Sequence, residues 1–99
     1  KMKVFELQQE FDWDAGNKGK NFKSHGVLDE ECEEAFFDPK KKILKDIVHS
    51  GVEPRYILLG ATKAQRILFL VFAIRKKKVR VISARDLNKK EQHLYEAKN

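Results

Sequence analysis

The sequence has few of the residues that build several common kinds of site. Cys32 is the single cysteine and Pro39 and Pro54 are the two prolines, which excludes an internal disulfide framework and a proline-rich segment. The five glycines are scattered, so no phosphate-binding loop follows a strand. The longest apolar run, Ile67 to Ile74, has eight residues, whereas a membrane helix needs roughly 20. We therefore expect a soluble, cytoplasmic protein that does not enter a membrane and has no cofactor.

Metal and thiol chemistry are also disfavoured. His25, His49, His93 and Cys32 do not form the Cys-x-x-Cys or His-x-x-x-His pairs that bind zinc, so we expect no metal site. Cys32 lies on the apolar stripe of a predicted helix, which favours a buried structural thiol over a nucleophile.

Charge is what the sequence has in excess, and it is unevenly distributed. The formal net charge is +6. Residues 26–39 hold six acidic side chains and no basic one, whereas residues 40–99 hold sixteen Lys or Arg and five Asp or Glu, a net of +11. Such a field attracts polyanions, of which nucleic acid is the usual one, although a solvated surface that maintains solubility has the same composition.

The length and the lack of repeats predict one domain over residues 1–99, with 1–10 forming an extension plus the first strand and 98–99 a tail. Alternation of apolar and polar residues predicts a strand from Lys3 to Trp13. Asp14 is expected to cap a helix near 14–25 that ends at Gly26. A second helix begins near Leu28 and stops before Pro39.

The second half of the chain has the period of strands. Four are expected, at 43–48, 55–60, 66–74 and 79–84, with turns too short for crossover helices. The last three form an antiparallel meander, and the apolar 66–74 strand is central. Asn88 and Glu91 have the spacing of a capping box for a short C-terminal helix. The predicted class is α+β, an antiparallel meander sheet of about four to five strands with two helices in the N-terminal half.

Several groups of polar residues are candidates for chemistry. On the first predicted helix, Lys18, Asn21 and His25 share a side; the alternative is a solvated face with Phe22 as its core contact. A loop brings His49, Glu53 and Arg55 together, or is an ordinary polar turn.

The basic residues near the last two strands form another group. Lys76, Lys77 and Lys78 form a hairpin tip that either solubilises the protein or grips phosphates, and Arg66 and Arg80 flank the strands. Arg85 follows two small residues that leave room for a ligand. If its strand is regular, Arg80 points to the opposite face from Arg85.

Residues 11–97 resemble the BrnT ribonuclease toxins, whose fold is similar to that of the RelE toxins. The matching segments are FDWD (11–14), NK (17–18), Asn21, KSHGV (23–27), EAFFDP (34–39), HS (49–50), Glu53-x-Arg55-Tyr56, RVISAR (80–85), KKE (89–91) and Tyr95. Pro54 departs from the family pattern, which usually has another residue there.

The resemblance implies RNA cleavage without metal, by attack of a ribose 2′-hydroxyl on the adjacent phosphate. It implies Arg55 and Arg85 as phosphate clamps, because guanidinium groups are bidentate and always charged, with Arg66 and Arg80 as second choices. Proton transfer or substrate positioning would come from Lys18, His25 or His49, oriented by Glu53. Glu91 could instead cap its helix and hold Arg85.

The resemblance also implies a partner. A ribbon-helix-helix antitoxin of the BrnA kind would neutralise the toxin, and operator DNA would be reached only through that complex. An isolated chain could pair with itself as a homodimer through exposed sheet surface. Two further functions stay open: a non-catalytic module that binds nucleic acid or an acidic protein, and a corepressor subunit.

Overall fold

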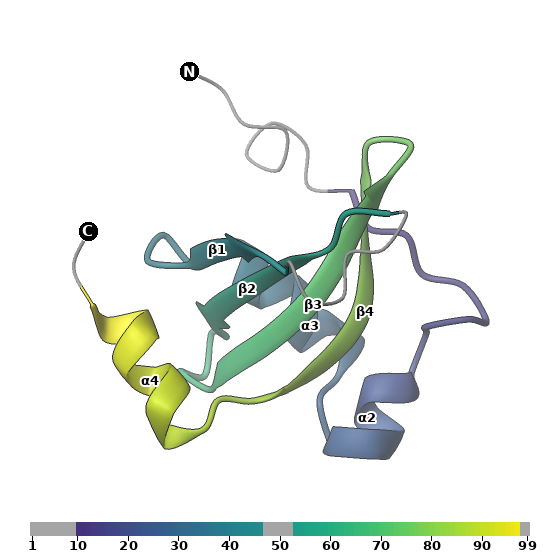
Figure 1. Ribbon diagram of the computed structural model, residues 1–99. Coiled ribbons are helices and arrows are strands. Elements are labelled where there is room, and N and C mark those ends of the chain that lie inside the picture. Colours follow the sequence, from purple (N-terminus) through teal and green to yellow (C-terminus); the bar gives the residue numbers. More distant parts are fainter. Residues whose placement is uncertain (1–9, 47–52, 98–99) are drawn as a thin grey trace.

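The computed structural model describes residues 10–46 and 53–97. Within them the chain is α+β, as expected, with three helices and four strands (Figure 1). In chain order these elements are α2 (Lys20–His25), α3 (Asp29–Phe36), β1 (Lys42–Lys45), β2 (Tyr56–Ala61), β3 (Ile67–Arg75), β4 (Lys78–Asp86) and α4 (Lys89–Glu96).

The strands form one antiparallel meander in the order β1-β2-β3-β4. The expected meander and the inner position of β3 are both confirmed. β1 is shorter than the predicted 43–48 strand, whose last two residues lie outside the described part. Most of the predicted 3–13 strand also lies outside it, and its described end makes one parallel bridge, Phe11 to Val79.

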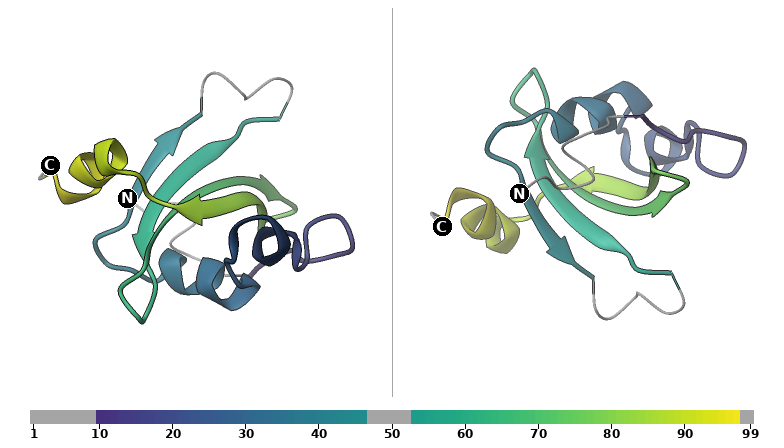
Figure 2. Two further views of the ribbon diagram at one scale, coloured as in Figure 1. Left: turned by 90° about the horizontal axis from the view of Figure 1, so that it is seen from below. Right: turned by 90° about the horizontal axis from the view of Figure 1, so that it is seen from above.

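Helix α3 covers one face of the sheet, and α2 lies beside β4 (Figures 1 and 2). The core between α3 and the sheet contains Phe36, whose ring packs edge-on against Phe72 at 4.9 Å between centroids. Gly60 allows this close approach, because a Cβ there would lie 2.5 Å from the carbonyl oxygen of Ala35. Other fully buried members of this core are Val27, Cys32, Leu58, Leu68, Leu70, Val79, Val81 and Ala84.

The first predicted helix begins later than expected. Residues 15–19 form turns, and the α-helix starts at Lys20. Asp14 does not cap it, because its carboxylate accepts hydrogen bonds from the backbone N–H of Gly16 and from the guanidinium of Arg80. Gly19 has a left-handed φ of 72° and immediately precedes the first residue of α2. The predicted end at Gly26 is confirmed, with a φ of 68°.

Two asparagines attach this segment to the sheet. The amide nitrogen of Asn17 donates to the carbonyl oxygens of Asp12 and Val81, and its oxygen accepts from the N–H of Asp14. The amide oxygen of Asn21 accepts from the N–H of Ala84 at 2.9 Å. Both side chains are buried, which satisfies backbone groups of the edge strand β4 that no neighbouring strand reaches.

Replacing Asn17 with alanine is expected to lower the free energy of unfolding by about 2 kcal/mol, because three backbone groups lose their partner and one of them is buried. The melting temperature should fall by roughly 8–16 °C. Urea unfolding followed by circular dichroism measures the change. Asn88→Ala is the matched control, since it removes an exposed helix cap and should lower the free energy of unfolding by about 1 kcal/mol. Equal losses in the two variants would contradict this account.

Candidate functional site

The face of the sheet turned away from α3 carries the candidate arginines. We call this surface the distal face. Cross-strand partners share a face, so the pairing places on it Ile57, Leu59, Phe69, Val71, Ala73, Arg80 and Arg85.

Arg80 and Arg85 share the distal face because β4 is irregular. Val81 pairs with Phe72 and Ser83 with Val71, so Ile82 is an extra residue, a β-bulge. The bulge shifts the alternation by one residue, and Arg80 beside Ala73 therefore points the same way as Arg85 beside Phe69. The regular strand that would have placed them on opposite faces is not formed.

Arg85 lies at the α4 end of the distal face, where three residues of the described part contact its guanidinium. Its guanidinium stands over the Phe69 ring at 4.1 Å from the centroid. Both terminal nitrogens donate to the Glu91 carboxylate, each at 2.8 Å, and one also donates to the carbonyl oxygen of Asp86. This hydrogen bonding raises the pKa of Arg85 and lowers that of Glu91, although partial burial opposes both shifts.

Glu91 has both roles that the sequence indicated for it. Its carboxylate accepts from the N–H of Asn88, whose side chain accepts in turn from the N–H of Glu91, which completes the capping box of α4. The same carboxylate holds Arg85. With 17% of its side chain exposed, Glu91 is more enclosed than Arg85, at 39%.

The other end of the distal face, beside the β3–β4 hairpin, holds a second charged group. Arg75 donates to Glu53 at 2.7 and 2.9 Å. That hydrogen bond lowers the pKa of Glu53. The positive charges of Arg75, Arg55 and Arg80 lower it further. Arg80 binds Asp14 through two bonds of 3.0 Å. Glu53, Arg55 and Arg80 therefore lie in one electrostatic environment.

Arg85 lies apart from this hairpin-side group. The β3 partners of Arg80 and Arg85, Ala73 and Phe69, are four residues apart, which is about 13 Å along a strand. Arg85 and the hairpin-side arginines can therefore contact one extended ligand at different points.

Three other candidates lie elsewhere. Arg66 lies on the α3 side, where it donates to Asp86, Glu31 and the carbonyl oxygen of Gly26, and so ties the α2–α3 junction to the sheet. His25 lies near Asp86 on that side, since its charge contributes to the lowered pKa of Asp86. Lys18 is exposed and precedes α2.

His49 lies outside the described residues. The alternative for the first predicted helix, a solvated face with Phe22 as its core contact, is wrong, because Asn21 is buried and Phe22 is 56% exposed.

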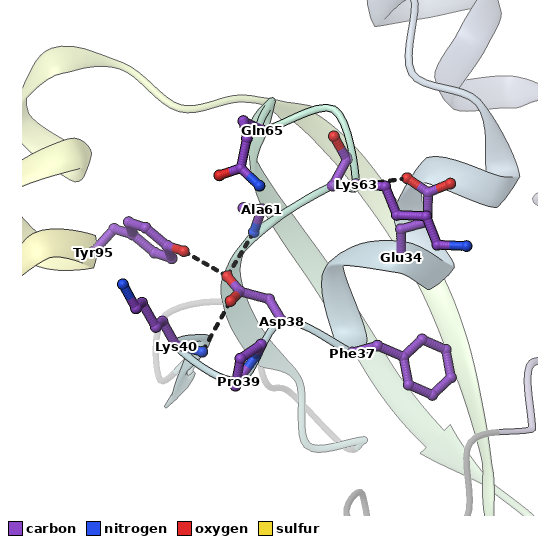
Figure 3. A pocket seen from close by; sticks show the side chains of 10 residues that line it. Glu34, Phe37, Asp38, Pro39, Lys40, Ala61, Lys63, Gln65 and Tyr95 are labelled. Atoms are coloured by element: carbon purple, nitrogen blue, oxygen red, sulfur yellow. Dashed lines mark hydrogen bonds between the residues drawn. The ribbon is translucent and has the colours of Figure 1, made fainter.

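Helix α4 is attached by polar contacts and buries no residue. The Tyr95 hydroxyl donates to Asp38 at 2.5 Å, and Lys42 donates to the carbonyl oxygens of Leu94 and Ala97. Asp38 also accepts from the N–H groups of Lys40 and Ala61 at the wall of an open pocket between α3, the β2–β3 turn and α4 (Figure 3). The Arg85–Glu91 pair thus depends on a helix whose other attachments are few and polar.

The attachment of α4 should weaken at high pH, where Tyr95 loses its proton. Burial and the hydrogen bond to Asp38 raise the pKa of the Tyr95 hydroxyl to about 12, whereas an unfolded tyrosine titrates near 10. The neutral phenol is therefore favoured in the folded protein, and its stabilising effect is complete below about pH 10 and lost as the pH rises to about 12. Absorbance at 295 nm, compared between the natural chain and Tyr95→Phe, should show a component with a midpoint near 12 that the variant lacks. If the component that Tyr95→Phe lacks has a midpoint near 10 instead, the contact between Tyr95 and Asp38 is contradicted.

The sequence reasoning missed Phe69, Asp12 and Asp14 as neighbours of the arginines. Phe69 sits in the central apolar strand, where its sequence pattern is that of a core residue. Its pairing with Arg85 depends on the bulge, for which the sequence around Ile82 has no glycine to give a signal.

In residues 10–46 and 53–97, no three His, Cys, Asp or Glu side chains gather as a set that could hold a metal ion. No helix in the described part is long and apolar enough to cross a membrane.

The fold and the site define the class of molecule. It is a small α+β protein whose sheet has α3 on one face and two arginines, Arg80 and Arg85, on the other. The model of one family, the ribonuclease toxin BrnT of type II toxin–antitoxin systems, matches residues 13–91. The chain belongs to the BrnT family, which confirms the resemblance found in the sequence. No curated protein matches the chain.

Proposed function

We propose that this protein cleaves RNA without a metal ion, through attack of a ribose 2′-oxygen on the neighbouring phosphorus at Arg85. The family consists of ribonuclease toxins of type II systems, which supports an RNA target and an antitoxin partner. The new P–O bond forms as the bond from phosphorus to the 5′-oxygen breaks. The products are a 2′,3′-cyclic phosphate and a free 5′-hydroxyl.

The observation that carries this proposal is the geometry of Arg85 and Glu91. A guanidinium that binds two carboxylate oxygens at 2.8 Å each presents the fork that two non-bridging phosphate oxygens require. The Phe69 ring beneath it fixes the plane of the fork. Pre-oriented donors of this kind stabilise charge that develops on a phosphate in the transition state.

Glu91 is the base in this scheme. When phosphate takes the fork of Arg85, the displaced carboxylate remains beside it and can accept the proton of the 2′-hydroxyl. In the free protein Glu91 is charged at neutral pH, since the hydrogen bond to Arg85 lowers its pKa. The leaving 5′-oxygen takes its proton from an acid, for which our candidate is His49, one of the residues that the family resemblance implies for proton transfer.

Arg55 contacts a different phosphate of the same strand in this scheme, because it belongs to the hairpin-side group. We leave Lys18, His25 and Arg66 out of the reaction, since His25 and Arg66 lie on the α3 side and Lys18 is in the turn before α2. For the partner we propose a ribbon-helix-helix antitoxin that covers the distal face. A homodimer through the same face would form only in its absence.

The test is incubation of purified protein with a labelled RNA of about 20 nucleotides, with and without EDTA. We expect cleavage in both, with fragments ending in 2′,3′-cyclic phosphate. RNA that is bound but left intact would replace the proposal with a non-catalytic binding or corepressor role. Fragments ending in 3′-hydroxyl would exclude attack by the 2′-oxygen. Cleavage abolished by EDTA would exclude the metal-free mechanism.

A further inference from the structure

The turn between β3 and β4 has a backbone conformation that its residues disfavour. Arg75 pairs with Lys78, and the two residues between them, Lys76 and Lys77, have φ values of 51° and 67°. A two-residue loop with both residues left-handed is a type I′ turn, in which Asn-Gly is the preferred pair. A lysine in this conformation is disfavoured by a factor on the order of ten. The chain has this unfavourable backbone conformation at two adjacent lysines.

The lysines make no compensating contact within the described residues. Lys76, Lys77 and Lys78 are exposed, and none of their side chains has a hydrogen bond or ion pair to residues 10–46 or 53–97. The arginines on either side differ, because Arg75 is paired with Glu53 and Arg80 with Asp14. The hairpin tip therefore presents positive charge that the described protein does not neutralise.

The tip is remote from Arg85. It projects above the sheet in Figure 1, at the end opposite α4. Seven positions separate Lys78 from Arg85 along β4, which corresponds to about 20 Å once the bulge is allowed for. Between them, Arg80 lies on the distal face. An extended polyanion that follows β4 would reach Arg85 and the tip together.

We propose that the β3–β4 hairpin tip binds backbone phosphates of the RNA several nucleotides away from the bond that is cleaved. This inference rests on the proposed ribonuclease function and adds a second contact point to it. Lysines touch phosphates without reading bases, so the tip contributes affinity and not sequence preference. It acts only on substrates long enough to span the distance from Arg85.

The experiment separates charge from conformation with two double variants. Lys76→Asn with Lys77→Gly removes both charges and relieves the backbone, whereas Lys76→Gln with Lys77→Gln removes the charges alone. Both should bind an RNA of about 20 nucleotides roughly tenfold more weakly at 0.1 M salt, with a salt slope lower by about 1.4. Only the Asn-Gly variant should melt several degrees higher. Lys20→Gln with Lys23→Gln, on α2, is the control of equal charge and should bind as the natural chain does.

Substrate length supplies the second readout. In both double variants, we expect kcat/KM to fall about tenfold on the long RNA and to stay unchanged on a dinucleotide substrate. The reason is that only the long RNA reaches the tip. The phosphate-binding role of the hairpin tip would be overturned if both variants bound and cleaved the long RNA as the natural chain does. It would also be overturned if they lost binding to a purified antitoxin but kept RNA binding. If the natural chain cleaves no RNA but the tip variants still lose RNA binding, the ribonuclease proposal fails and the phosphate-binding role of the hairpin tip stands.

Discussion

Arg85→Ala is expected to lower kcat/KM for RNA cleavage by about 10²–10³, because the variant loses both donors that would bind the phosphate at the reacting centre. Arg85→Lys keeps the charge but not the bidentate fork, and should recover only part of the activity. Single-turnover cleavage of an end-labelled RNA measures the effect. Circular dichroism and the melting temperature show whether the fold is retained.

Arg75→Ala is the matched control for Arg85. It removes an exposed arginine that also forms a bidentate pair with a glutamate, but at the hairpin end of the sheet. We expect at most a few-fold loss of cleavage, since a remote phosphate contact contributes affinity without stabilising the transition state. Full activity in Arg85→Ala, or an equal loss in both variants, would remove Arg85 from the reaction centre.

Glu91→Gln should lower kcat by about 10² while KM changes little, because glutamine keeps the size of the side chain but accepts no proton. In the natural chain the acidic limb of the pH profile of kcat/KM, which reports the free protein, should lie below the ordinary glutamate value of 4.5, since Arg85 lowers the pKa of Glu91. Activity is then present above this limb and lost as the pH falls through it. The limb should be absent from the residual activity of the variant.

Asn88→Ala distinguishes chemistry from positioning at Glu91. It removes the partner that fixes the first turn of α4 but leaves the carboxylate in the chain. We expect little change in kcat for this variant. A loss as large as that of Glu91→Gln would mean that Glu91 acts by holding α4 and Arg85 in place.

The elements with strong local signals could be predicted from the sequence. The continuous apolar run in 66–74 predicted the inner strand β3, and Gly26 marked the end of α2 through its left-handed conformation. The spacing of Asn88 and Glu91 predicted the start of α4, and the contact with Arg85 was one of the roles expected for Glu91. Each of these depends on neighbours within a few residues, so the sequence pattern contains the needed information.

The features that depend on distant contacts could not be predicted in this way. Asp14 has the residue type of a helix cap, but Arg80, 66 residues later, takes its carboxylate. Asn21 has the polarity of a surface residue, yet Ala84 offers it a buried N–H. At the site, the shared face of Arg80 and Arg85 results from one unpaired residue in β4. These contacts form only after the sheet is assembled, which is why periodicity does not reveal them.

Cys32 has a consequence for how the protein can be studied. Its thiol is fully buried, and burial raises its pKa to about 12, so almost none of it is present as the reactive thiolate at neutral pH. A cysteine introduced on the outer surface of α4 or at the hairpin tip would thus be the one thiol that a maleimide dye labels. Fluorescence from a single dye could then follow the motion of either segment, without first replacing the native cysteine.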